Sequence, residues 1–143
     1  MSTFVLVHGA WHGSWCWKRV RRALQARGHE VFTPTLTGVA DRLHLLSPQV
    51  DLETHITDVT NLIRWEELAD VVLCGHSYGG CVISGVADRV SDRIGAWSIW
   101  MRSSWRTPKA FTILILPSRG TRRSKRRGKL ERAGKYRRFP PKR

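Results

Sequence analysis

Hydrophobic and polar positions follow two different periods along residues 1–96 of this chain. Short apolar runs over 3–7, 30–34 and 71–74 are typical of strands in a parallel sheet. Between and after them, apolar residues recur at helical spacing over 17–24, 52–63 and 82–90. This alternation with short connections predicts an α/β fold built on a parallel sheet.

Several residues are placed to define the ends of these elements. Asp51 precedes the second helical segment and is a preferred N-cap residue. Gly28 follows the first helical segment and can end it in a left-handed conformation. We expect a loop between Leu36 and Pro48, and strand 30–34 to end at Pro34, which lacks a backbone N–H.

The charge of the chain changes abruptly near residue 96. The formal net charge is +14, which normally indicates a nucleic-acid or membrane-surface partner. Residues 1–96, however, hold 9 Lys and Arg against 10 Asp and Glu, whereas residues 97–143 hold 16 Lys and Arg against one acid, Glu131. We therefore divide the chain into a first part, 1–96, and a basic tail, 97–143, whose composition predicts disorder.

Other sequence features limit the compartment and the cofactors. Three cysteines give no disulfide framework and no metal-ligand spacing, which favours a reducing compartment. The first apolar run is too short for a signal peptide or a membrane span. We expect a cytoplasmic protein with no membrane segment, no metal and no cofactor.

The segment VVLCGHSYGG (71–80) contains the pattern Gly-x-Ser-x-Gly between a strand and a helix. This is the context of a nucleophile elbow, a tight turn that lifts a serine hydroxyl off the end of a sheet. The positions two before and two after the serine must be small, and Gly75 and Gly79 meet that requirement. The pattern predicts Ser77 as a nucleophile, with the Tyr78 backbone N–H facing the developing oxyanion.

Three motifs, in this order, resemble the α/β-hydrolase superfamily. They are FVLVHGAWHGSWCW (4–17), LTG (36–38) with DR (41–42) and HLL (44–46), and GHSYGG (75–80). They are most similar to the small esterases that include plant methyl-salicylate-type esterases and hydroxynitrile lyases. The resemblance implies a parallel-sheet α/β-hydrolase fold that stops after the helix following the elbow.

The resemblance also implies roles for individual residues. Ser77 is the implied nucleophile, and Ala10 and Tyr78 supply the backbone N–H groups of the oxyanion hole. Gly9, Gly75 and Gly79 shape the loop and the elbow. The implied pocket residues are His8, Trp11, His12 and His76.

The general base of this fold is missing from its expected place. The family order is serine, then acid, then histidine, but all six histidines precede Ser77. The acids after Ser77 are Asp88, Asp92 and Glu131, none of them where the family places its acid. His76 is next to the serine, yet neighbouring side chains diverge in such a turn. We therefore expect the chain to be inactive or nearly so.

The basic tail has a specific candidate origin. Trp and Met have single codons, so Trp100-Met101 read one nucleotide earlier forces an aspartate codon. With permitted codons around it, the shifted frame reads Leu-Val-Tyr-Leu-Asp-Ala-Phe-Val, which resembles the next strand of the family. We hypothesise that one lost base near codon 96 put residues 97–143 out of frame.

Three functions remain open from the sequence. The first is a serine hydrolase that attacks small carboxylic esters through an acyl-enzyme at Ser77. The second is a non-enzymatic protein that binds nucleic acid or another polyanion through the basic residues of 119–143. The third is a hydroxynitrile-lyase relative, whose pocket lysine would have to come from further downstream.

Overall fold

The computed structural model describes residues 1–102 and 110–115, and the side chains of residues 1–100. A single sheet has the strand order β2-β1-β3-β4-β5. The strands are β1 (Thr3–Val7), β2 (Glu30–Phe32), β3 (Val71–His76), β4 (Ile94–Arg102) and β5 (Ala110–Ile115). The helices are α1 (Lys18–Gln25), α2 (Leu52–Trp65) and α3 (Tyr78–Arg89), and short 3₁₀ turns are η1 (Ser14–Trp17), η2 (Ala40–Leu45) and η3 (Ser91–Arg93).

The first four strands in this order are parallel, which confirms the predicted fold class. In the register of the two central strands, Val7 of β1 lies level with Gly75 of β3. The loop that follows β1 and the turn that follows β3 therefore leave the same edge of the sheet. That edge, formed by the carboxyl ends of parallel strands, is where such folds place their ligands.

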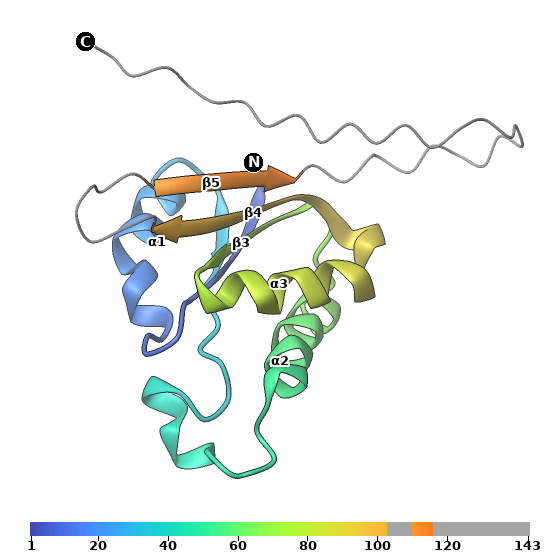
Figure 1. The fold of residues 1–143 in the computed structure, drawn as a ribbon. Coiled ribbons are helices and arrows are strands. Elements are labelled where there is room, and N and C mark those ends of the chain that lie inside the picture. Colours follow the sequence, from blue (N-terminus) through green and yellow to red (C-terminus); the bar gives the residue numbers. More distant parts are fainter. Residues whose placement is uncertain (103–109, 116–143) are drawn as a thin grey trace, which may run out of the picture.

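Helix α3 lies against the sheet, and α2 packs beside α3 (Figure 1). Alternate residues of β3, Val71 and Leu73, are buried on the face that carries the core, while Val72 and Cys74 are only partly buried. The core lies among β1, β3, α2 and α3, and its fully buried side chains include Val5, Val7, Val59, Ile63, Val82, Ile83 and Val86. This packing fixes α3, and therefore the turn at its amino end, against the sheet.

The predicted helix boundaries are confirmed at two positions. The Asp51 side chain accepts a hydrogen bond from the Thr54 backbone N–H, and the Thr54 hydroxyl accepts one from the Asp51 N–H, which completes a capping box. Gly28 has a φ of 78° beyond the end of α1. The segment 36–48, which is predicted to be a loop, differs from that prediction in containing the 3₁₀ turn η2.

The sheet continues past residue 96, where the hydrolase-like pattern is predicted to end. β4 crosses that position in parallel with β3, and β5 pairs antiparallel with β4. Without β4, the edge of β3 would present unpaired backbone groups. Trp97, Ile99 and Trp100 have high β-propensity, so this segment can pair there whatever its origin. Most of residues 97–143, which are predicted to be disordered, lie outside the described residues. Residues 119–143, which are predicted to bind polyanions, lie wholly outside them.

Candidate active site

The elbow has the strand–turn–helix geometry that the sequence predicts. β3 ends at His76, α3 begins at Tyr78, and Ser77 between them has φ 52° and ψ −118°. A non-glycine residue with this backbone conformation is strained, and such strain is common at functional sites. Ser77 is exposed, so its hydroxyl is accessible at the carboxyl edge of the sheet.

The glycines on either side of Ser77 leave no room for a side chain. A Cβ on Gly75 would lie 2.5 Å from the carbonyl oxygen of Gly79. A Cβ on Gly79 would lie 2.6 Å from the carbonyl oxygens of both Val7 and His8. The first turn of α3 therefore packs directly on the end of β1, which brings the elbow next to the loop that carries Ala10.

The loop after β1 also contacts the elbow from the other side. A Cβ on Gly9 would lie 2.8 Å from Nδ1 of His76 and 3.1 Å from its carbonyl oxygen, so the two segments touch through main chain and ring. Ala10 is exposed, and Trp11 has a φ of 68° with 92% of its surface exposed. The structure thus brings Gly9, Ala10 and the elbow together at one edge.

His8 lies beneath this loop as a support. Its ring is 1% exposed, and its Nε2 accepts a hydrogen bond from the Leu36 backbone N–H at 3.1 Å. Its Nδ1 is 2.8 Å from the Gly9 carbonyl oxygen, which can only accept, so Nδ1 carries the proton. Burial lowers the pKa of His8, which favours this neutral form.

His12 and His76 form an aromatic group at the surface near the elbow. Their ring centroids are 6.0 Å apart in an edge-to-face arrangement, and the Trp15 ring lies 5.4 Å from His12. His12 donates from Nδ1 to the Ala10 carbonyl oxygen at 2.8 Å. Burial, and then the proximity of His12, lower the pKa of His76. In the described part of the chain, no hydrogen bond joins either ring to the Ser77 hydroxyl.

A second buried histidine, His55, was not among the predicted site residues. It lies on α2, is 8% exposed, and has Nδ1 2.8 Å from the Tyr78 hydroxyl and Nε2 2.9 Å from the Thr37 carbonyl oxygen. The sequence signal was its spacing, because His55 falls between Leu52, Ile56 and Val59 on the apolar face of the predicted helix. A polar residue within such a face is expected to have buried partners.

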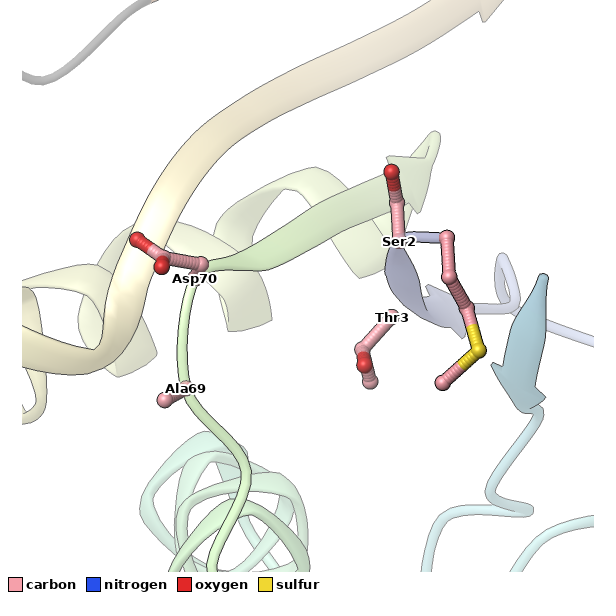
Figure 2. A pocket seen from close by; sticks show the side chains of 5 residues that line it. Ser2, Thr3, Ala69 and Asp70 are labelled. Atoms are coloured by element: carbon pink, nitrogen blue, oxygen red, sulfur yellow. The ribbon is translucent and has the colours of Figure 1, made fainter.

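A hollow of about 280 Å³ lies at the opposite, amino edge of the sheet (Figure 2). Its lining comes from the start of β1 and the turn before β3, and consists of Met1, Ser2, Thr3, Ala69 and Asp70. It is remote from the elbow, because Ser77 follows the carboxyl end of β3. Within residues 1–102 and 110–115, no cluster of His, Cys, Asp and Glu could hold a metal ion, and no helix is long and apolar enough to cross a membrane.

Comparison with known proteins agrees with this geometry. A 94-residue segment is 60% identical to a carbendazim hydrolyzing esterase of Nocardioides sp. (strain SG-4G), covering 66% of this chain and 39% of that protein. Methylesterase 2 of Arabidopsis thaliana is 35% identical over 102 residues, covering 64% of this chain and 35% of the relative. The chain therefore spans only about two fifths or less of the length of these relatives.

A solved structure supports the same assignment. An extracellular alpha/beta-hydrolase from a Paenibacillus species superposes with a TM-score of 0.65 and 32% sequence identity, over 73% of this chain and 42% of the other. The sequence profile of the Alpha/beta hydrolase family matches residues 4–142. The chain, with its esterase-like relatives and its elbow on a parallel sheet, belongs to the alpha/beta hydrolase family.

Proposed function

We propose that this chain carries the nucleophile and the oxyanion-binding part of a serine esterase that acts on small carboxylic esters. The observation that carries the proposal is the elbow itself, with exposed Ser77 held at φ 52° between β3 and α3. The names of the relatives, a carbendazim hydrolyzing esterase and a methylesterase, support an ester-like substrate.

In the proposed reaction, the Ser77 Oγ attacks the ester carbonyl carbon and its proton is lost to solvent. The carbonyl oxygen becomes an oxyanion that accepts hydrogen bonds from the backbone N–H groups of Ala10 and Tyr78. Collapse of the tetrahedral intermediate breaks the bond to the alcohol oxygen and leaves an acyl group on Ser77. Each oxyanion donor lowers the barrier by about 2.7–4 kcal/mol in comparable enzymes.

Water must then attack the acyl-enzyme, and this step also needs a proton acceptor. All six histidines precede Ser77 in the sequence. His8 and His55 use both ring nitrogens in other contacts, and His12 uses Nδ1 on Ala10. We infer that this chain reacts slowly with an activated ester and releases the acyl group more slowly still, by several orders of magnitude relative to an esterase with its base.

The test is stoichiometric acylation by p-nitrophenyl acetate, read by absorbance and by intact-protein and peptide mass spectrometry. We expect one acetyl group per chain, on the peptide containing Ser77, and little turnover afterwards. Ser77→Ala should abolish this adduct. Ser84→Ala is the matched control, because Ser84 lies on the same helix with its hydroxyl donating to the Gly80 carbonyl oxygen. An adduct that survives in Ser77→Ala, or none in the wild type, would refute the proposal.

The charge of the basic tail favours a second activity, the binding of polyanions. Residues 97–143 carry 16 Lys and Arg against one acid, and such a segment binds phosphate groups without reading sequence. We propose that any nucleic-acid binding is of this non-specific kind, lost at moderate salt. Tight, sequence-dependent binding that persists at high salt would contradict it.

The origin of the tail has a direct test in the gene. A nucleotide read across codons 90–115 should show that one added base restores Leu-Val-Tyr-Leu-Asp in frame. A frame that stays closed after the insertion would overturn the frameshift hypothesis. Hydroxynitrile-lyase chemistry on this scaffold is tested by assaying the restored frame with a cyanohydrin and with an ester.

A further inference from the structure

His55 connects the elbow to two other parts of the fold. The Thr37 carbonyl oxygen can only accept a hydrogen bond, so the His55 Nε2 carries the ring proton and donates it at 2.9 Å. In the neutral ring, Nδ1 then accepts a hydrogen bond from the Tyr78 hydroxyl at 2.8 Å. The two rings meet edge to face with their centroids 5.7 Å apart, so position and orientation are both defined.

The partner on the other side of His55 is itself held firmly. Asp58, three residues further along α2, accepts from the Thr37 backbone N–H at 2.7 Å and from the Thr37 hydroxyl at 2.9 Å. The preceding residue, Leu36, is fully buried and donates its N–H to His8. Consecutive residues of one loop therefore anchor His55 and His8.

This arrangement links the two proposed oxyanion donors. His8 lies under the loop that carries Ala10 and contacts the Gly9 carbonyl oxygen. His55 holds the side chain of Tyr78. Tyr78 is the first residue of α3, so its backbone N–H has no partner within the helix. The direction of that N–H depends on the peptide that joins Ser77, with its φ of 52°, to Tyr78. The anchored Tyr78 side chain restricts how this peptide can turn.

We propose that His55 is a positioning residue that holds Tyr78 so that its backbone N–H points into the oxyanion hole. The role rests on the proposed esterase function, since it concerns the same oxyanion. His55 does not touch the reacting atoms and acts only through Tyr78 and Thr37. Its substitution should therefore slow acylation of Ser77 and leave binding of the ester nearly unchanged.

Three variants and one control separate this role from simple packing. His55→Phe fills the same space but removes both hydrogen bonds. His55→Gln keeps one carbonyl oxygen to accept from Tyr78 and an amide to donate to Thr37. Tyr78→Phe removes only the hydroxyl. His29→Phe is the control, because His29 also packs edge to face on an aromatic ring, that of Phe4, but at the far edge of the sheet.

The first measurement uses NMR of the full chain labelled with ¹⁵N and does not require activity. In the neutral His55 ring, the proton should lie on Nε2. His55→Phe and Tyr78→Phe should both move the backbone amide resonance of residue 78, whereas His29→Phe should not. If the Tyr78 amide moves no more in His55→Phe than in the control, His55 does not position it and the proposal is overturned.

The second measurement is the rate of Ser77 acylation by p-nitrophenyl acetate as a function of ester concentration. We expect His55→Phe to lower the maximal rate constant about tenfold, with half-saturation changed less than about twofold, and His55→Gln to recover most of the loss. Equal rates in wild type and His55→Phe would overturn the proposal. If the wild type forms no Ser77 adduct, the esterase proposal fails, and the Tyr78 amide then decides whether His55 holds the elbow.

Discussion

Gly79→Ala is the most direct test of how the elbow is built into the fold. The added Cβ would lie 2.6 Å from the carbonyl oxygens of Val7 and His8. Carbon–oxygen contacts in proteins are normally about 3.3 Å or longer, so α3 and the end of β1 would have to separate by about 0.7 Å. Both obstructing atoms belong to the main chain, so no change of rotamer can relieve the clash.

The size of the effect follows from two opposing terms. Overpacking in a well-packed region costs about 1–3 kcal/mol, and a clash with main chain belongs at the upper end of that range. Alanine is favoured over glycine within a helix by about 1 kcal/mol. We therefore expect Gly79→Ala to lower the free energy of unfolding by about 2 kcal/mol, a large share of the stability of a small domain.

Gly80→Ala is the matched control for this substitution. Its Cβ would lie 2.7 Å from Cγ2 of Ile99, a side-chain atom that a change of the Ile99 χ1 angle can move away, and it gains the same helical preference. We expect its free energy of unfolding to stay within about 1 kcal/mol of the wild type. The assay is urea unfolding followed by far-ultraviolet circular dichroism. Equal losses in Gly79→Ala and Gly80→Ala would refute the argument that close main-chain approach fixes the elbow.

Three further predictions concern strain, pH and helix capping. Ser77→Gly should raise the free energy of unfolding by about 1 kcal/mol, because glycine accepts φ 52° without strain. Ser77→Ala should not raise it, and urea unfolding of both variants checks this difference. Burial lowers the pKa of His8 below its ordinary value of 6.5, so the unfolded chain takes up a proton first as pH falls. The free energy of unfolding, measured with urea, should therefore decrease from about pH 7 downward. The decrease should be less steep in His8→Gln. Asp51→Ala should lower the urea midpoint and Asp51→Ser should restore most of it, since serine also caps helices.

Local features of the fold were predictable because neighbouring residues determine them. The elbow follows from the spacing of Gly75, Ser77 and Gly79 after an apolar run, and the structure has the strand, turn and helix in those positions. The cap at Asp51 needs only the following turn of helix. The turn of the elbow and the cap each span five residues or fewer, so the sequence pattern predicts their local geometry. The packing of Gly79 on Val7 and His8 is long-range and is not part of that pattern.

Contacts between distant segments were not predictable in the same way. The hydrogen bond between His55 and Tyr78 joins residues 23 apart, and nothing in either local pattern identifies the partner. Pairing of β4 with β3 depends on the free edge of the sheet, which exists only after folding. The apolar spacing around His55 indicated that it needed partners, but only the three-dimensional arrangement identifies them as Tyr78 and Thr37.

The proposed chemistry separates two contributions that esterases combine, which are stabilisation of the oxyanion and proton transfer by a general base. In this chain, Ser77 has its turn and we propose the Ala10 and Tyr78 N–H groups as oxyanion donors, but the described residues hold no histidine hydrogen-bonded to Ser77. Electrostatic stabilisation of an oxyanion needs no proton transfer, whereas activation of serine and of water both need a base. An elbow without its base should therefore respond to hydroxide: the acylation rate should rise steadily with pH, without the plateau near neutrality that a titrating histidine produces.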